Sequence, residues 1–288
     1  MKKNIFTYVW IFFQATCLFA QNATEKALLW EVSGNGLSKP SYLFGTFHAL
    51  CKGDLNDKIS PTLKDKFEQT QQLCMEIDLN EKGMQWTMLQ GAFMKEDKKL
   101  QDLVSAEEYA VVKTFFKDSL RKNLDKYQRM KPMFLSSLPI ESYLGCKVKS
   151  LEKTFNKMAK KQAKTTKGLE TAAFQLEIFD KISYQEQAQG LVEMAKNFGA
   201  SRQEFNALLK AYNEKDMVNI EKLSQESEEM ENFTEELLFN RNATWIPKMQ
   251  KMMQEKSTFF AVGAGHLPGK KGVIQLLRAQ GYTVKAIE

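Results

Sequence analysis

The chain has 288 residues, a formal net charge of +6 and 43% hydrophobic residues. This hydrophobic content is ordinary for a globular protein and excludes a chain too polar to form a core. Basic and acidic residues are interspersed through most of the sequence, and the one basic cluster, residues 149–167, is typical of a helix with a solvated face. The charge pattern therefore gives no indication of a nucleic-acid partner.

The N-terminus has the three parts of a secretory signal peptide. Two lysines precede an apolar run at residues 5–13, and Ala20 then closes the segment before polar residues begin. The apolar run is too short for an ordinary membrane span. We therefore expect residues 1–20 to be cleaved and residues 21–288 to form one domain that is periplasmic or secreted, with no stable membrane span. An N-terminal anchor that stays attached is the alternative.

Next along the chain come short runs with the length and the β-branched or aromatic content of strands. Between about residues 80 and 256 apolar side chains instead recur at helical spacing. Strand, helix and strand follow one another at the C-terminus, which favours an α/β fold. We expect a mixed sheet from the N- and C-terminal segments, covered by a large helical insertion at about 80–256. The five predicted strands are 28–32, 42–47, 73–79, 258–263 and 282–287.

The sequence contains two histidines, and each ends the same short motif. Gly45 and His48 follow the apolar run YLF, and Gly263 and His266 follow the apolar run FFAV. Since glycine makes up ~7% of residues, chance alone would place it three residues before both histidines about once in 200 chains. A glycine at a strand end can turn sharply and bring backbone close to a ligand. Each imidazole would then lie at the carboxyl edge of the sheet, where α/β proteins bind ligands.

A third predicted strand offers a carboxylate to the same point. Glu76 lies in the segment LCMEIDL, and two histidines with one carboxylate are a familiar ligand set for a catalytic divalent metal. We therefore predict that His48, His266 and Glu76 bind a metal, although zinc, manganese, cobalt and iron all accept these ligands. Neither an HExxH helix nor a G-x-S-x-G elbow is present. The alternatives are histidines without a ligand, or Cys51 acting as a nucleophile with His48.

The cysteines left after cleavage number three, so at most one intrachain disulfide can form. Cys74 lies in a predicted buried strand, where we expect a reduced thiol. Cys51 and Cys146 lie in predicted loops, where the geometry of a disulfide is attainable and export favours oxidation. A Cys51–Cys146 bond is therefore possible, and three free thiols are the alternative.

Longer segments resemble the TraB/GumN family, which also includes the secreted Wnt-inactivating TIKI metalloproteases. The resemblance covers essentially all of the mature chain, and the paired G-x-x-H motif is its most specific part. The cysteines and the signal peptide resemble the secreted, Bacteroidota-type members. The opening and closing blocks are LLWEVSGNGLSKPSYLFGTFHAL and FFAVGAGHLPGKKGVIQLLRAQGYTV, and the looser intermediate blocks are LCMEID, KGLETAAFQ and NRNATW.

The resemblance implies a core similar to the erythromycin-esterase and ChaN-like folds. It also implies a metal-dependent hydrolase that acts on peptides or small molecules, with His48, His266 and Glu76 in its site. An open alternative is a non-catalytic periplasmic protein that holds a small ligand or a metal without turning it over.

The same match adds Glu170, Arg241 and Asn242 as candidate catalytic residues. In this hypothesis Glu76 or Glu170 moves protons, Arg241 binds an oxyanion or a substrate carboxylate, and Asn242 donates a further hydrogen bond to the oxyanion. Glu152 is a further candidate, although the motif around it matches more loosely.

Overall fold

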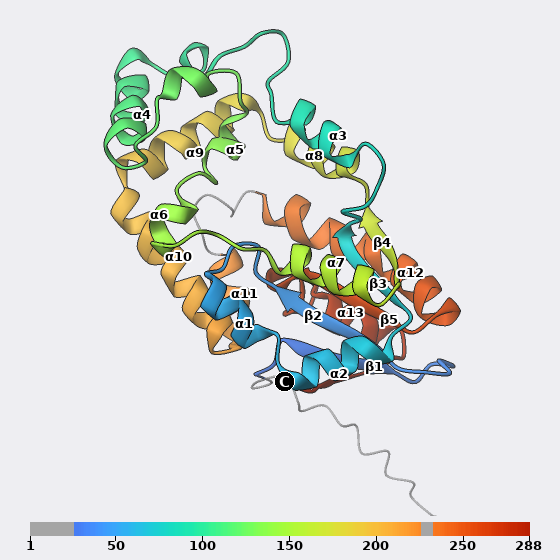
Figure 1. Cartoon of the computed structure of the whole chain (residues 1–288). Helices are drawn as coiled ribbons and strands as arrows, with labels where there is room; N and C mark the ends of the chain where they lie inside the picture. The colour runs from blue at the N-terminus through green and yellow to red at the C-terminus, as the bar shows by residue number, and fades with distance from the viewer. Residues whose placement is uncertain (1–25, 226–232) are drawn as a thin grey trace, which may run out of the picture.

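A mixed sheet forms the core of one half of the molecule (Figure 1). The computed structural model describes residues 26–225 and 233–288, so the predicted signal peptide lies outside the described residues. The described residues form one six-stranded sheet in the order β4-β3-β5-β2-β1-β6. Its strands are β1 (Leu29–Ser33), β2 (Ser41–Thr46), β3 (Gln72–Ile77), β4 (Thr165–Glu170), β5 (Thr258–Gly263) and β6 (Thr283–Ala286).

The strand directions set where the functional side chains can lie. β4, β3, β5 and β2 run parallel to one another, whereas β1 pairs antiparallel with both β2 and β6. The prediction of a mixed sheet is confirmed, and all five predicted strands are present. β5, from the C-terminal part of the chain, lies between β2 and β3. The carboxyl ends of three strands that are distant in sequence therefore meet at one edge.

The edge strand β4 was not predicted, because it lies within the segment expected to be helical. Its sequence, TTKGLE, is short and polar, and its exposure alternates along most of its length, as in a half-covered edge strand. A Cβ on Gly168 would lie 2.7 Å from the backbone nitrogen of Asp78 and 2.6 Å from the backbone oxygen of Glu170. Glycine therefore permits the close approach of β4 to the end of β3.

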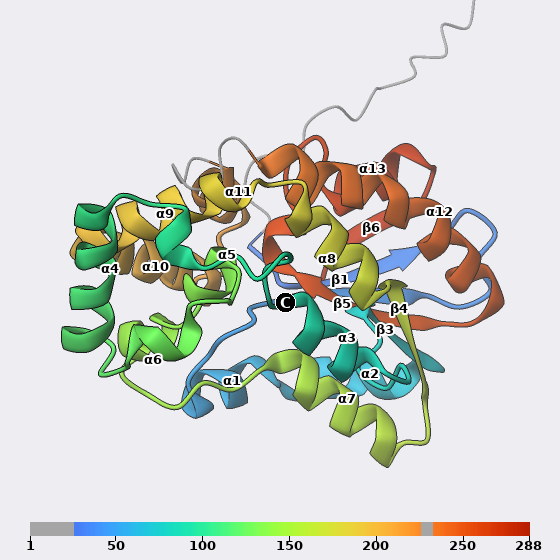
Figure 2. The ribbon, with the colours of Figure 1, turned by 90° about the horizontal axis from the view of Figure 1, so that it is seen from above.

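Helices cover both faces of the sheet (Figures 1 and 2). Seen from above in Figure 2, α1, α2 and α7 lie on one side of the strands, and α12 and α13 lie on the other. Phe67 of α2, Phe155 of α7 and Phe259 of β5 pack ring against ring in the core between them. These helices are α1 (Lys52–Lys58), α2 (Pro61–Gln69), α7 (Leu151–Lys161), α12 (Asn240–Glu255) and α13 (Val273–Ala279).

The rest of the predicted insertion lies beside the sheet rather than over it (Figure 1). Buried residues such as Val112, Phe116 and Leu191 form a second hydrophobic cluster there. Because these helices bury their apolar faces against one another, they build a separate lobe instead of covering the strands. Its main helices are α4 (Ala106–Asp118), α5 (Pro132–Leu135) and α9 (Tyr184–Lys196), and the nearby helices are α3 (Met84–Gly91), α6 (Ile140–Leu144) and α8 (Ala172–Asp180). α10 (Phe198–Asn213) and α11 (Met217–Gln225) join the lobe to the sheet, because their buried residues Ala211, Tyr212 and Ile220 belong to the core around the sheet.

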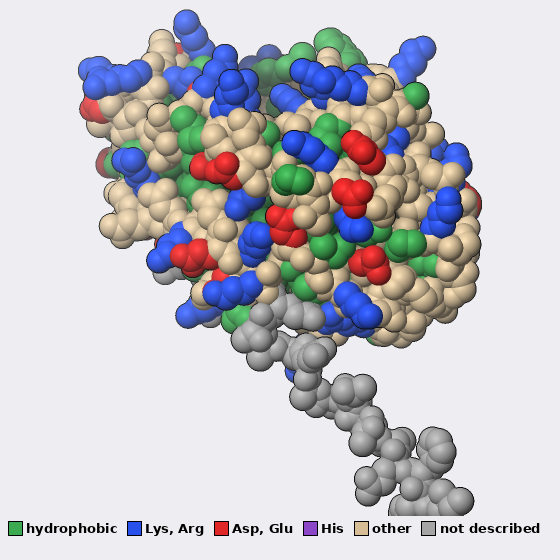
Figure 3. Space-filling model, turned by 60° about the horizontal axis from the view of Figure 1, so that its bottom comes forward, with side chains coloured by type: hydrophobic (Ala, Val, Ile, Leu, Met, Phe, Trp, Pro, Cys, Tyr) green, Lys and Arg blue, Asp and Glu red, His purple; other side chains and the backbone are tan. Residues whose placement is uncertain are grey.

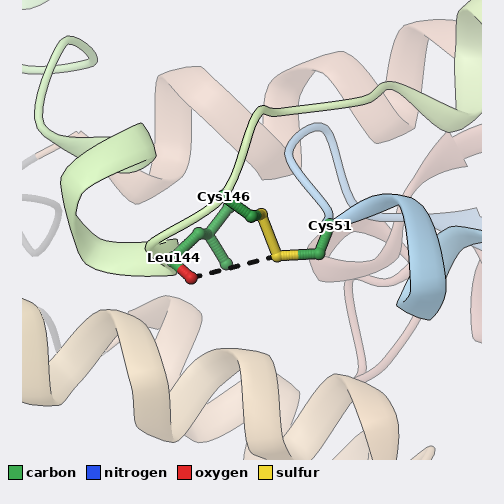
Figure 4. Close-up of a disulfide and its surroundings, with 3 residues drawn as sticks. All are labelled: Cys51, Leu144 and Cys146. Atoms are coloured by element: carbon green, nitrogen blue, oxygen red, sulfur yellow. Dashed lines mark hydrogen bonds between the residues drawn. A yellow bond between two sulfur atoms is a disulfide. The ribbon is translucent and has the colours of Figure 1, made fainter.

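A disulfide joins the sheet half of the molecule to this lobe (Figure 4). Cys51 follows β2 and bonds to Cys146, which lies just after α6, and the Sγ atom of Cys51 also lies 3.9 Å from the carbonyl oxygen of Leu144. Cys74 is the free cysteine among the described residues, and its burial in β3 raises the pKa of its thiol. The bond therefore ties the loop that follows His48 to the helical lobe.

Across residues 26–225 and 233–288, no helix combines the length and the apolar character that a membrane span requires. On the face drawn in Figure 3, basic and acidic side chains are interspersed, as the sequence indicates.

Candidate active site

Three side chains from three neighbouring strand ends converge at Gly263, the last residue of β5. A Cβ atom on Gly263 would lie 3.2 Å from Oε1 of Glu76, 3.5 Å from Cδ2 of His266 and 3.6 Å from Nε2 of His48. Glu76 belongs to β3, His48 follows β2, and His266 follows β5. The structure therefore brings both histidines of the paired motif and the predicted carboxylate to one point.

His266 is buried and held in a single orientation by Asn242 of α12. The amide nitrogen of Asn242 donates to the backbone oxygens of Lys271, at 2.9 Å, and of His266, at 3.3 Å. Its Oδ1 atom must therefore accept the 2.7 Å hydrogen bond from Nδ1 of His266, which leaves Nε2 of that ring without a proton. Burial lowers the pKa of His266 to about 3, so the ring is neutral.

His48 is oriented in the same way by Glu152, the second residue of α7. Nδ1 of His48 lies 2.8 Å from Oε1 of Glu152, and that carboxylate also accepts hydrogen bonds from Thr46, at 2.7 Å, and Ser150, at 2.6 Å. Because an ionised carboxylate only accepts, Nδ1 of His48 carries a proton and Nε2 faces Gly263. Desolvation lowers the pKa of His48, but the hydrogen bond and charge of Glu152 outweigh it and raise the pKa to about 9. At neutral pH the ring is therefore a cation that also carries a proton on Nε2, and a metal ion would have to displace that proton. The side chain is 70% accessible because it faces an open cavity.

Glu76 is an ionised carboxylate with both oxygens engaged. Oε1 accepts from the backbone nitrogen of Gly263 at 2.8 Å, and Oε2 accepts from Arg241 at 2.7 Å and from Gln175 at 3.3 Å. Burial by itself raises the pKa of Glu76, but the charges of Arg241 and His48 and the hydrogen bond from the backbone of Gly263 hold it well below its usual range. A carboxylate with so low a pKa is suited to bind a cation and poorly suited to accept a proton.

Arg241 has no donor left for a substrate in this arrangement. Its Nη1 group lies 2.8 Å from the backbone oxygen of Leu237 and 3.2 Å from Nε2 of His266, and Nη2 donates to Glu76 and Glu170. Nε donates to both oxygens of Glu170, at 3.0 and 3.1 Å, which accounts for all five N–H groups of the guanidinium. The side chain therefore fixes the cluster and does not present the free oxyanion donor that we expected.

Glu170 and Asn242 also differ from the roles expected for them. The side chain of Glu170 is completely buried, accepts hydrogen bonds from Arg241 and from the indole of Trp245, and does not line the cavity. It is therefore placed to hold Arg241 and not to exchange protons with a substrate. The amide of Asn242 is occupied by His266 and Lys271, so it orients the imidazole instead of donating to an oxyanion.

The two motif glycines serve close packing, and neither makes the sharp turn that we expected. Gly45 lies within β2, where a Cβ would lie 2.9 Å from the side chain of Leu267 and 3.1 Å from Cβ of Ala264. Because Gly45 has no Cβ atom, the short helix η4 (Ala264–His266) can pack against the strand. Gly263 has a φ of −53°, and its missing side chain leaves the space onto which the site residues face.

Several supporting residues were not predicted, although three of them lie in segments that carried the family resemblance. Thr46 stands inside the first G-x-x-H motif, and Gln175 and Trp245 stand in KGLETAAFQ and NRNATW. Ser150 precedes Glu152 as the N-cap of α7. Their positions in the motifs were visible, but the hydrogen bonds they make join segments that are remote in sequence.

A cavity of about 610 Å³ opens onto this cluster. His48, Glu76, Arg241 and His266 lie along one wall, at the carboxyl edge of the sheet. The remaining wall comes mostly from apolar side chains of the helical lobe and of the segment before α12. A concave apolar space with a few converging polar groups is the usual form of a ligand site.

The cluster has the donor chemistry of a divalent metal site, but its present geometry is not that of a metal cage. Among the described residues, no three His, Cys, Asp or Glu side chains are arranged as a metal-binding group. Both histidines nevertheless have Nδ1 bonded to an oxygen acceptor and Nε2 turned towards Glu76, which is how metal-binding imidazoles are oriented. Arg241 contacts Nε2 of His266 and Glu76, so it competes with any cation for these two ligands.

The fold and the site define an α/β protein with a histidine, glutamate and arginine cluster at the carboxyl edge of a mixed sheet. Residues 28–286 match the profile of the TraB/PrgY/gumN family, and the chain belongs to that family. The resemblance seen in the sequence motifs is thereby confirmed.

Two relatives carry the name metalloprotease. The chain is 22% identical to a metalloprotease TIKI homolog from Amphimedon queenslandica, over 93% of this chain and 63% of that protein. It is 41% identical to metalloprotease TIKI1 from Danio rerio over a shorter stretch, which covers 18% of this chain and 11% of that protein. The chain thus spans somewhat less than two thirds of the sponge relative's length. No solved structure matches the chain.

Proposed function

We propose that this protein is a metal-dependent hydrolase that cleaves peptides. The observation that carries the proposal is the matched orientation of His48 and His266. In both rings Nδ1 is bonded to an oxygen acceptor, and both rings approach Glu76 at Gly263. The similarity to proteins named metalloproteases supports the same class of reaction.

The residues of this chain divide into ligands and supports. His48, His266 and Glu76 would hold a divalent ion, which when bound polarises a carbonyl group and lowers the pKa of a bound water. Glu152 and Asn242 keep the Nδ1 protons of the two histidines in place, so that both Nε2 atoms remain directed at the site. The apolar side chains of the cavity lower the polarity of the surroundings of the cluster, which strengthens the electrostatic interactions made there.

Arg241 and Glu170 act on Glu76. Arg241 holds Oε2 of Glu76 and lowers the pKa of that carboxyl, so Glu76 stays ionised and ready to bind a cation. Glu170 fixes Arg241 from the side away from the cavity. A positive side chain beside a cation ligand also limits the affinity of the site for the metal ion.

The test is metal analysis of the purified protein followed by digestion of a peptide library with and without chelator. We expect cleavage that chelator removes and added metal restores. Glu76→Gln should abolish cleavage, whereas the matched control Glu31→Gln on β1 should keep it. A protein that cleaves equally well in excess chelator, or a Glu76→Gln variant with full activity, would contradict the proposal.

A second candidate function is a binding protein that holds a metal or small ligand without turnover. The observation that favours it is the complete hydrogen bonding of Arg241, which leaves the cluster satisfied without any substrate. Stoichiometric metal or ligand binding without cleavage of any library peptide would support this candidate over the hydrolase.

We also propose that the protein is exported and cleaved after Ala20. The N-terminal pattern supports this, as does a cysteine pair joined in a disulfide, because such bonds persist mainly in oxidising compartments. N-terminal sequencing of the protein recovered outside the cytoplasm should begin at Gln21. Recovered protein that begins at Met1 would contradict the proposal.

A further inference from the structure

The cavity beside the candidate active site has an apolar far wall built by helices that the sequence patterns did not connect with function. Phe179 comes from α8, Ile182 from the turn after it, Phe205 and Leu208 from α10, and Leu237 from the segment before α12. These elements are separated in sequence, yet their side chains line the same space as His48 and Glu76. The apolar wall is therefore continuous with the proposed site of cleavage.

Most of the charged side chains in the lining lie at the other end of this cavity. Apart from the histidine, glutamate and arginine cluster, the described lining contains one charged side chain, Glu186. Oε2 of Glu186 is occupied, since it accepts hydrogen bonds from the backbone nitrogen of Ser183 at 3.0 Å and from its hydroxyl at 2.7 Å. An acidic group placed against the far wall would lose its hydration and face the carboxylate of Glu186, whereas an apolar group would gain from burial.

We propose that this wall binds bulky apolar side chains of a peptide next to the bond that is cleaved. The inference rests on the proposed function and adds the class of substrate. A volume of about 610 Å³ is in the ordinary range for a ligand pocket and accommodates more than one large side chain. The preference is for aromatic and branched aliphatic residues over small or acidic ones.

The serine hydroxyls in the lining favour a peptide over a fatty acyl chain. Ser136 and Ser137 donate their hydroxyl protons to the backbone oxygens of Pro132 and Phe134, at 3.3 and 2.7 Å. Each hydroxyl oxygen can still accept a hydrogen bond. A peptide backbone supplies N–H groups for these oxygens, and a hydrocarbon chain does not.

Gly190 of α9 allows the apolar wall to be filled without disturbing the catalytic cluster. It lines the cavity, and a Cβ at this position would have no atom within 4 Å. Leucine is also a better helix former than glycine, so Gly190→Leu should not weaken α9. The new side chain occupies the space that a large substrate side chain would take.

Gly199 of α10 gives the matched control. It is also a helical glycine whose Cβ would meet nothing within 4 Å, but it is exposed and does not line the cavity. Gly199→Leu therefore makes the same chemical change away from the wall. Thermal unfolding of both variants reports whether either substitution harms the fold.

The experiment compares two fluorescein-labelled peptides that differ only at the central positions, one Phe-Leu and one Ala-Ala. Cleavage is measured as kcat/KM, and binding is measured by fluorescence anisotropy. For the wild type we expect the Phe-Leu peptide to be preferred. Gly190→Leu should lower kcat/KM for that peptide about tenfold or more, while Gly199→Leu should change it by less than about twofold.

The two proposals fail in different ways. If neither peptide is cleaved but Gly190→Leu still weakens binding of the Phe-Leu peptide, the hydrolase is wrong and the apolar peptide site stands. If both peptides are cleaved equally and Gly190→Leu affects them equally, the hydrolase stands and the apolar preference is overturned. The inference is also overturned if the Phe-Leu peptide binds no better than the Ala-Ala peptide and myristate displaces it. That result would assign the wall to an acyl chain.

Discussion

Nδ1 of His48 lies 2.8 Å from Oε1 of Glu152, although 104 positions separate the two residues in the chain. If His48 binds a metal, this carboxylate keeps the imidazole proton on Nδ1 and the ring turned towards Glu76. Glu152→Ala should therefore lower the metal affinity about 10- to 100-fold while the protein remains folded.

Isothermal titration of zinc into the chelator-treated protein measures this effect. Glu31→Ala, which removes a carboxylate from β1, is the control and should bind zinc as the wild type does. An unchanged affinity in Glu152→Ala would show that Glu152 does not support a metal ligand.

The two motif glycines should respond differently to the same substitution. Gly263→Ala places a methyl group 3.2 Å from Oε1 of Glu76 and 3.6 Å from Nε2 of His48, in the space between the proposed ligands. We expect this variant to lose metal binding and cleavage while its thermal unfolding temperature stays close to that of the wild type.

Gly45→Ala should instead act on stability. Its methyl group would lie 2.9 Å from Leu267 and 3.1 Å from Ala264, where η4 packs on β2, and such overpacking costs about 1–3 kcal/mol. Urea unfolding of both variants separates the two effects. If Gly263→Ala proves as destabilising as Gly45→Ala, the space at Gly263 is part of the packing and not a ligand site.

Arg241→Leu should be strongly destabilising, because it leaves two buried carboxylates without their cation. Glu76 and Glu170 both accept hydrogen bonds from this guanidinium, and Glu170 has no exposed side-chain surface. Removing one partner of a buried ion pair costs about 3–5 kcal/mol.

The midpoint and slope of urea unfolding give that free energy. Arg202→Leu, on the exposed surface of α10, is the control and should change stability by no more than about 0.5 kcal/mol. A comparable small change in Arg241→Leu would mean that the glutamates find other partners or take up protons.

The disulfide should contribute measurably to stability. It closes a loop of 95 residues, and the chain-entropy estimate for such a loop is about 4–5 kcal/mol, as an upper figure. Reductant should therefore lower the free energy of unfolding of the wild type. The double variant Cys51→Ser and Cys146→Ser should start lower and be insensitive to reductant. Equal unfolding curves for the wild type with and without reductant would contradict the prediction.

The sequence was sufficient to predict those strands and helices whose signal lies within a short segment of the chain. Short runs rich in apolar, aromatic and β-branched residues predicted β1, β2, β3, β5 and β6. The signal is clearest for β2 and β5, which are buried along their whole length. The same rule could not find β4, whose polar residues match neither a buried strand nor an amphipathic helix. The helical segments were predicted from the spacing of their apolar residues. The sequence did not predict that many of these helices pack around a core of their own. Periodicity shows that one face of a helix is buried, but it does not show which element covers that face.

The same distinction between local sequence signals and tertiary packing applies to the candidate site. By itself the sequence determined the composition of the site: a pair of G-x-x-H motifs, a carboxylate on a third strand, and, through the family resemblance, the candidates Glu170, Arg241 and Asn242. Only the tertiary structure decided their roles. It turned Arg241 and Asn242 into supports for Glu76 and His266, placed Glu170 out of reach of the cavity, and brought Glu152 to His48. The reason is physical: a hydrogen bond depends on distances of about 3 Å between atoms, and the packing of β3 beside β5 and of α7 and α12 on the sheet sets those distances.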